Sequence, residues 1–293
     1  DIDHLRRLGK EHVYVLELGE QDIHENEAAL RLAEALAGSG TEYSRDIVEG
    51  KVTIRAATDG LLKIDREALL RFNLLGEVMC ATLQTNTPVS RGEQVAASRM
   101  IPLVGSRQLV EQAVAIARSG EAIVRVLPLG RVRAVLVITG TEVFSGLIED
   151  RFEQVLRDKL TDLGSSVGPV RFAPDDPGLI AAAITECLAE GAELVLTSGG
   201  MSVDPDDVTR LGIALAGAED MVYGTPVLPG AMFLVGRSGR VPVLGLPACG
   251  MFHGITVLDL VLPRILTGET IGRAELAALG HGGLCRNCSH CQY

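Results

Sequence analysis

The stretch Leu194-Val195-Leu196-Thr197-Ser198-Gly199-Gly200-Met201-Ser202 decides the fold of the C-terminal half of the chain. Its apolar, β-branched start and its Ser-Gly-Gly turn predict a strand over 194–197 that brings a loop to the carboxyl edge of a parallel sheet, where ligands bind. Glycines let a backbone turn tightly and approach a ligand closely, so that loop amides can point at an anion. We therefore expect an anion-binding loop that consists of Ser198, Gly199, Gly200, Met201 and Ser202.

Acidic residues follow this loop directly. Asp204 is placed as the N-cap of a helix, Pro205 as its first residue, and Asp207 where its side chain can hydrogen-bond back to the cap. In this interpretation Asp207 is a helix cap. However, three carboxylates crowd the segment 204–207, and they would repel a phosphate unless a divalent cation lay between them. The pattern alone leaves both interpretations open.

A regular alternation of strands and helices surrounds the loop. The near-continuous apolar run over 134–138 is typical of a strand that is covered on both faces. Helices are predicted over 152–163 and 179–188, with a strand over 170–173 between them. This order predicts an α/β fold, a three-layer parallel or mixed sheet with right-handed crossovers. The carboxyl ends of its strands then converge on one crevice, to which they bring Thr139, Gly140, Glu142, Asp175 and Asp176.

A fourth ligand loop is predicted after a β-hairpin. Residues 232–235 and 241–244 are its strands, and 236–239 are its turn. Gly245, Leu246 and Pro247 come next, and a helix is predicted over 252–266. We expect this loop to join the same crevice.

The N-terminal half has a different pattern of predicted strands and helices. A strand is predicted over 12–18 and a helix over 26–37, with Asp22 and Glu25 at capping-box spacing before it. Short β-type runs lie between 47 and 103, and a helix follows over 107–118. We therefore predict three regions: an α+β, β-rich accessory domain with a small barrel-like or sandwich-like part over 1–125, a ligand-binding α/β domain over 126–270, and a C-terminal helix with a Cys-rich tail over 271–293.

The composition argues against several classes of partner. A length of 293 residues, 47% of them hydrophobic and 22% charged, fits a packed protein of two domains. The net charge of -11 and an aromatic content of 3% argue against nucleic acid, which is bound through Lys and Arg and through stacking on aromatic rings. We expect no membrane span, because no apolar run is long enough. The chain starts without the apolar core of a signal peptide, so we expect a cytoplasmic protein.

Several motifs together resemble the molybdopterin-binding domain of molybdopterin adenylyltransferases and molybdotransferases. The run from Thr197 to Asp207 is similar to the family's Thr-Ser/Thr-Gly-Gly signature with its final acid. The segment 139–142 stands where the family has Thr-Gly-Asp-Glu, and 146–150 stands at its Gly-x-Ile-x-Asp. Asp175-Asp176 matches the acidic pair after its second strand, and 245–247 matches its Gly-Leu-Pro loop. The motifs follow the family's order across residues 130–268.

The resemblance implies a protein of molybdenum cofactor biosynthesis that binds molybdopterin or adenylyl-molybdopterin. It implies that Asp150 and Asp207 bind Mg²⁺ for nucleotidyl transfer or hydrolysis during molybdate insertion, and that the Ser-Gly-Gly-Met-Ser loop holds the phosphate. Homo-oligomers are also expected. From the residues alone, Asp150 is equally a first-turn acid favoured by the helix dipole, and Asp175 and Asp176 are equally turn formers. The residues that would line the cofactor site are Thr139, Gly140, Glu142, Asp175, Asp176, Gly245, Leu246 and Pro247.

Departures from the family pattern leave more than one function open. Asp150 is followed by Arg151-Phe152 instead of Ser/Thr-Asn, Asp204 replaces a common glycine, and Gly-Leu-Pro continues as Ala-Cys-Gly. One hypothesis is an adenylyltransferase-like or molybdotransferase-like enzyme. Another is a non-catalytic carrier or sensor of molybdopterin that serves a client molybdoenzyme. A nucleotide pyrophosphatase that uses the same domain is the third.

The C-terminal cysteines form a separate candidate site. Cys285, Cys288 and Cys291 have the spacing of the first three ligands of a bacterial iron–sulfur run. Three thiolates leave a cluster or a tetrahedral zinc ion one ligand short. The sequence is therefore compatible with a metal site and with a tail of free thiols.

Overall fold

The computed structural model describes residues 6–7, 9, 17–202, 204, 207–251 and 253–285. The chain divides into two compact units, one formed by Asp1–Thr85 and Val89–Val126, the other by Asn86–Pro88 and Leu127–Tyr293. In the described part of the chain, no helix has the length and apolar character needed to cross a membrane.

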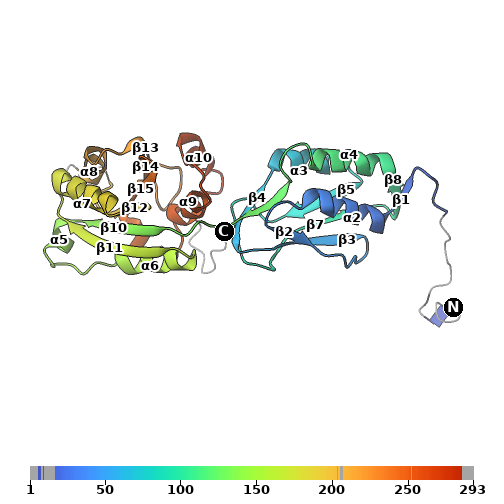
Figure 1. Ribbon diagram of the computed structural model, residues 1–293, viewed down its shortest axis with the longest axis horizontal. Helices are drawn as coiled ribbons and strands as arrows, with labels where there is room; N and C mark the ends of the chain where they lie inside the picture. The colour runs from blue at the N-terminus through green and yellow to red at the C-terminus, as the bar shows by residue number, and fades with distance from the viewer. Residues whose placement is uncertain are drawn as a thin grey trace. The chain divides into compact units, whose positions relative to one another are not determined.

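A six-stranded sheet forms the centre of the C-terminal unit (Figure 1). Its strands are β10 (Arg133–Thr139), β11 (Ser166–Ala173), β12 (Leu194–Ser198), β13 (Glu219–Tyr223), β14 (Leu234–Ser238) and β15 (Val241–Leu246). They lie in the order β11-β10-β12-β15-β14-β13. The first four are parallel, and β14 and β13 continue the sheet in antiparallel pairs. The sheet is therefore mixed, with its parallel part formed by the predicted alternation.

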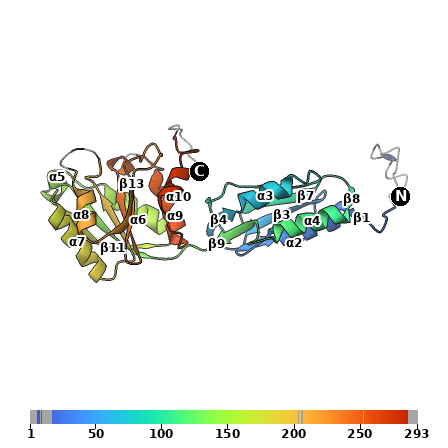
Figure 2. The same cartoon turned by 90° about the horizontal axis from the view of Figure 1, so that it is seen from above.

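Helices cover both faces of this sheet, which Figure 2 shows between its two helical layers. On β10, Ala134 and Leu136 belong to one core and Val135 and Val137 to the other, because neighbouring strand residues point to opposite faces. The first core contains α6 (Phe152–Asp162), α9 (Val257–Leu266) and α10 (Arg273–Ala278), and the second contains α7 (Pro177–Ala189) and α8 (Thr209–Leu215). The predicted three-layer α/β fold is confirmed.

Two helix starts differ from those predicted. Helix α8 begins at Thr209, whereas Asp207 and Val208 are not helical, so Asp204 and Asp207 are not its cap and third residue. Helix α9 begins at Val257 instead of residue 252. Its start is set by a reciprocal cap, because Thr256 Oγ1 accepts from the Leu258 amide and the Asp259 carboxylate accepts from the Thr256 amide. A short α5 (Thr141–Phe144), a 3₁₀ turn η1 (Ala248–Met251) and β13 were not predicted.

The N-terminal unit is an α+β structure, as predicted. Its antiparallel sheet has the order β2-β3-β7-β5, and its smaller sheets have the orders β6-β4-β9 and β1-β8. Helices α2, α3 and α4 contribute buried residues to its largest core. The elements are β1 (Asp22–His24), α2 (Glu25–Leu36), β2 (Thr41–Tyr43), β3 (Lys51–Ala56), β4 (Gly60–Ile64), α3 (Arg66–Asn73), β5 (Val78–Thr82), β6 (Pro88–Val89), β7 (Gln94–Met100), β8 (Val104–Ser106), α4 (Arg107–Ala117) and β9 (Val124–Leu127).

Local details of this unit correct the sequence interpretation. The cap of α2 is His24, whose Nδ1 accepts from the Asn26 amide, and not Asp22, which lies in β1. Helix α3 was missed within the β-type region, although Asp65 caps it by accepting from the Ala68 amide. Most of the predicted strand 12–18 lies outside the described residues, and Glu17 and Leu18 are not in a strand.

A buried thiol gives the N-terminal unit a pH-dependent stability. Burial raises the pKa of Cys80 to about 12, from an ordinary value of 9.0. The Asn73 side chain pairs with both the amide and the carbonyl of Cys80, which fixes β5 against α3. Because the folded pKa is the higher one, the folded chain keeps a proton that the unfolded chain loses above pH 9. This contribution is fully present below pH 9 and is lost as the pH rises towards 12.

We therefore predict that the free energy of unfolding decreases between pH 9 and pH 11 more steeply in the wild-type chain than in Cys80→Ala. Urea denaturation at several pH values measures both slopes. The wild type also contains Cys187, whose pKa burial raises, so only the difference between the two chains reports on Cys80. Parallel pH profiles of the two chains would contradict the prediction.

Candidate functional site

The strand order creates a topological switch point between β10 and β12. From β10 the chain passes through α6 to β11 at the sheet edge, and from β11 it passes through α7 to β12 on the other side of β10. The two helices cover opposite faces, and in this fold class ligands bind where such connections diverge, here at the carboxyl ends of β10 and β12. These strands end at Thr139 and Ser198, which places the predicted loop at the ligand position of this fold class.

A buried cluster of hydroxyl groups joins the two strand ends to α8. Thr139 Oγ1 donates to the Ser198 carbonyl at 2.7 Å and lies 2.8 Å from Thr209 Oγ1. A hydroxyl has one proton, so Thr209 is the donor in that second contact. All three residues are buried. The cluster therefore fixes where the double-glycine loop leaves the sheet.

The two glycines of the loop are required by close packing against this cluster. Gly199 has φ +84°, and a Cβ on it would lie 2.4 Å from the Thr139 carbonyl oxygen. Gly200 has φ +53°, and its Cβ would lie 2.4 Å from Thr209 Oγ1. Both the backbone conformation and the space exclude a side chain. The sequence pattern predicted glycines here for the close approach of a ligand, whereas the atoms they approach in the structure belong to the protein.

The loop carries a buried side-chain hydroxyl that has no partner among the described residues. Ser198 Oγ is buried, and among the described residues nothing forms a hydrogen bond with it. An unsatisfied buried hydroxyl is rare and costs about 1–3 kcal/mol. Met201, by contrast, is a core residue: its side chain fills the space beside Gly245, and its carbonyl accepts from the Tyr223 hydroxyl at 2.6 Å. Ser202 is partly buried.

The acidic pair after β11 has structural roles in this state. Asp175 Oδ2 accepts from the amide of Thr141 at 2.8 Å and from its hydroxyl at 3.0 Å. Asp176 caps α7 by accepting from the Leu179 amide. Gly140 (φ +135°) donates its amide to Ala173, and Glu142 is exposed. The structure therefore joins the ends of β10 and β11 through Asp175, as the fold predicted, and uses both acids as turn or cap residues.

Asp150 and Asp207 were predicted to bind Mg²⁺. Asp150 Oδ1 accepts from the Phe152 amide at 3.0 Å and Oδ2 from the Glu153 amide at 2.8 Å, so its carboxylate caps α6. Asp207 is partly buried, and its amide donates to the Asp204 carbonyl. Across the described positions, no group of three or more His, Cys, Asp and Glu side chains could hold a metal ion. The Mg²⁺ site stays a prediction.

The predicted cysteine site falls largely outside the described residues. Cys288 and Cys291 are not described. Cys285 is described, and its amide donates to the Leu228 carbonyl at 2.8 Å. The iron–sulfur or zinc interpretation therefore also stays a prediction.

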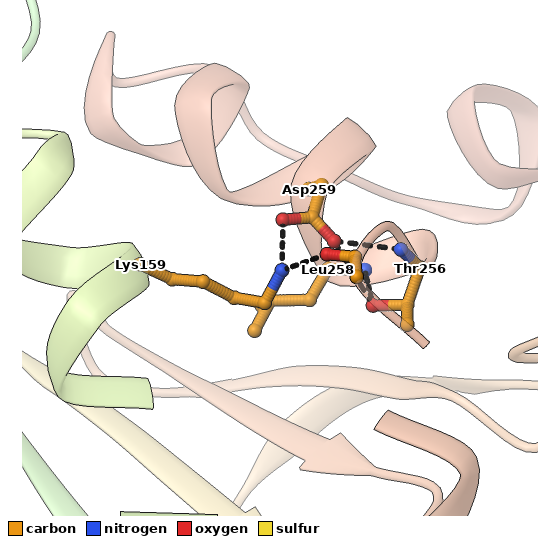
Figure 3. A network of polar contacts seen from close by, with 5 residues as sticks. Lys159, Thr256, Leu258 and Asp259 are labelled. Carbon is orange, nitrogen blue, oxygen red and sulfur yellow. Dashed lines mark hydrogen bonds and ion pairs between the residues drawn. The ribbon is translucent and has the colours of Figure 1, made fainter. Parts of the chain in front are cut away.

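The loop after β15 is held by an ion pair that the sequence analysis missed (Figure 3). Lys159 of α6 forms an ion pair with Asp259 of α9, and its Nζ donates to the Gly254 carbonyl at 2.7 Å. Asp259 is the capping acid of α9, so one carboxylate sets the helix start and binds α6. The Thr-x-x-Asp spacing at 256–259 is a sequence signal for the cap, but not for its lysine partner. A small apolar pocket beside it is lined by Phe152, Val155, Leu156, Leu246, Pro247 and Val257.

These observations define an α/β domain with a polar site at the switch point of its sheet. Residues 135–267 match the family described as "Probable molybdopterin binding domain". The recognition made from the sequence is thereby confirmed, and this segment carries a domain of that family. The matched residues all lie in the C-terminal unit, and none lies in the N-terminal unit.

Curated relatives match a smaller part of the chain. A CinA-like protein of Mycobacterium sp. (strain MCS) is 34% identical over 93 residues, which are 32% of this chain and 22% of the relative. A CinA-like protein of Mycobacterium tuberculosis (strain ATCC 25618 / H37Rv) is 38% identical over 77 residues, 26% of this chain and 18% of the relative. The chain thus spans about a fifth of the length of the curated relatives it matches.

Solved structures are similar over about half of the chain. The molybdopterin biosynthesis enzyme MoaB from Thermus thermophilus has 23% identity and a TM-score of 0.40, and the match covers 47% of this chain and 98% of that one. The protein CinA with unknown function from Thermoplasma acidophilum has 19% identity and a TM-score of 0.39, with 47% and 97% covered.

The hydroxyl cluster leads to a stability prediction. Thr139→Val keeps the shape of the side chain but leaves the Ser198 carbonyl and the Thr209 hydroxyl without their partner, so the free energy of unfolding should fall by about 1–3 kcal/mol. Thr139→Ser keeps the hydroxyl and is the matched control, with a smaller expected loss. Urea denaturation of the three chains tests this. Equal losses in both variants would show that the methyl group, not the hydroxyl, stabilises the loop.

Proposed function

We propose that the chain binds molybdopterin or its adenylylated form at the carboxyl edge of β10 and β12. The observation that carries the proposal is Ser198 Oγ, a buried hydroxyl without a partner in the described chain, on the double-glycine loop of a molybdopterin-binding-type domain. A phosphate oxygen of the ligand would satisfy this hydroxyl. Loop glycines are suited to hold such a group through their amides. The N-terminal unit, which lies outside the family match, would engage a client molybdoenzyme.

The residues proposed for the site come from several strand ends. Ser198, Gly199, Gly200, Met201 and Ser202 would form the phosphate loop. Thr139, Gly140, Glu142, Asp175 and Asp176 would line one side of the crevice, and Gly245, Leu246 and Pro247 the other. We also propose that the chain forms homo-oligomers.

The finer proposal is Mg²⁺-dependent chemistry at Asp150 and Asp207 in nucleotidyl transfer, hydrolysis or molybdate insertion. Mg²⁺ is commonly held by one or two carboxylates together with the phosphates of the substrate, so a pair of acids is a sufficient protein contribution. When bound, the ion neutralises phosphoryl oxygens and stabilises charge that develops in the transition state. Asp150 and Asp207 would hold it, and the loop amides and Ser198 would orient the phosphate.

A carrier or sensor without turnover is the second candidate. It is favoured by Asp150, whose two carboxylate oxygens both accept amides of α6. A carboxylate used in this way already has a structural role. In this candidate the same loops retain the pterin without changing it, and no molybdate is inserted.

We predict that Ser198→Ala weakens molybdopterin binding by about 10–100-fold, because it removes one hydrogen bond to a charged group. The free energy of unfolding should not fall, since the hydroxyl has no partner in the described protein to lose. Ser238→Ala, at the opposite end of β14 and β15, is the matched control and should bind like the wild type. Titration of purified chains with molybdopterin measures the dissociation constants. Failure of the wild type to bind molybdopterin would reject the proposed function.

A second experiment separates catalysis from carriage. With molybdopterin, ATP, Mg²⁺ and molybdate, an enzyme should turn over, and Asp207→Asn should reduce turnover by about 100-fold or more while leaving pterin binding largely intact. Product formation is followed by chromatography of the oxidised, fluorescent pterins. Stoichiometric retention of unchanged molybdopterin by the wild type would exclude catalysis and support the carrier.

A further inference from the structure

Arg210 is a partly buried cation next to the double-glycine loop. It is the second residue of α8 and follows Thr209, which contacts both Thr139 and Gly200. Its guanidinium carbon lies 4.2 Å from the centroid of the Tyr223 ring. Its Nε is buried and has no hydrogen-bond partner among the described residues. Among the described residues, the guanidinium is therefore held by an aromatic face and not by an acid.

Tyr223 connects this cation to the loop. The Tyr223 hydroxyl donates to the Met201 carbonyl at 2.6 Å, while the ring face carries Arg210. A ring attracts a cation through its quadrupole but does not neutralise it. The charge of Arg210 is thus kept beside the loop by a residue that also fixes the loop backbone.

That no acid of the described residues pairs with Arg210 is unexpected for this chain. Its formal net charge is -11, and Asp207 lies three residues before Arg210, yet no ion pair between these two described residues is formed. Other arginines of the same unit are paired: Arg237 with Asp220, and Arg264 with Glu269. A partly desolvated guanidinium without a counter-charge is unfavourable unless an anion joins it.

We propose that Arg210 binds the phosphate of the pterin ligand held by the double-glycine loop. Guanidinium groups suit this task, because their planar donors match phosphate oxygens in pairs. The positive charge also offsets the repulsion between that phosphate and the acids that follow the loop. This inference rests on the proposed function for its pterin ligand, and it adds the specificity for a phosphorylated pterin over a dephosphorylated one. No sequence motif marks Arg210 as a site residue.

The test compares Arg210→Gln with Arg240→Gln. Arg240 is an exposed arginine at the turn between β14 and β15, at the end of these strands that lies away from the double-glycine loop. Its replacement by Gln changes the net charge by the same amount as Arg210→Gln. Dissociation constants are measured for molybdopterin, for dephosphorylated molybdopterin, and for ADP as a phosphoanhydride without a pterin. Thermal denaturation of each variant checks that it is folded. Arg210→Lys completes the series, since it keeps the charge without the planar fork.

We expect Arg210→Gln to weaken the binding of molybdopterin by about 10–100-fold. The same variant should weaken the binding of dephosphorylated molybdopterin by less than about twofold. Arg210→Lys should be intermediate, and Arg240→Gln should remain within about threefold of the wild type. Equal molybdopterin binding by the wild type and Arg210→Gln would overturn this inference and leave the proposed function intact. If Arg210→Gln weakened the binding of molybdopterin and of dephosphorylated molybdopterin equally, the inference would also be overturned. Arg210-dependent binding of ADP without any binding of molybdopterin would support the phosphate role and reject the pterin.

Discussion

The hydrogen bond from Thr139 Oγ1 to the Ser198 carbonyl links the two strand ends on which the site depends. Strands β10 and β12 are neighbours in the sheet, but the helices that follow them leave on different faces, so the backbone diverges immediately beyond this contact. The printed pairing of the two strands ends at Ile138 and Ser198. The threonine hydroxyl adds a side-chain hydrogen bond at this end, and the same oxygen accepts from Thr209 at the start of α8.

This arrangement explains why residues without side chains are needed beside it. Gly199 and Gly200 lie so close to Thr139 and Thr209 that an added Cβ would overlap the carbonyl or hydroxyl oxygen. The loop is therefore packed from inside by the hydroxyl cluster, and Met201 and Tyr223 hold its continuation. A loop that is fixed in this way keeps the direction of its backbone groups before any ligand arrives. Such preorganisation reduces the ordering cost of binding.

The sequence was sufficient for the elements whose signal is local or periodic. The apolar run at 134–138 predicted a strand covered on both faces, and alternate residues of β10 do belong to two different cores. Helix starts were less predictable, because several residues competed as caps. Asp204 and Pro205 have the composition of a helix start, yet α8 begins at Thr209, where the hydroxyl contact with Thr139 places it. Tertiary contact overrode the local signal.

Contacts between residues far apart in the chain were not predictable. Lys159 and Asp259 are brought together only by the packing of α6 and α9, and Arg210 meets Tyr223 only because β13 lies at the far edge of the sheet and α8 crosses that face. Neither pair has a spacing that a sequence pattern could reveal. The family resemblance marked which loops matter, because it rests on motifs within loops. It carried no information about the pairs that hold those loops.

The cap formed by Asp150 bears on the choice between an enzyme and a carrier. Each carboxylate oxygen has two lone pairs, so accepting one amide of α6 leaves each oxygen of Asp150 able to accept a second partner. Capping and metal binding are therefore compatible for the same side chain. What the cap does is fix the carboxylate to the start of α6, so that its reach towards the double-glycine loop depends on the segment between β10 and α6. That segment exposes Phe144, Leu147 and Ile148, apolar side chains that a ligand or a neighbouring chain would have to cover for the acid to act in a dry site.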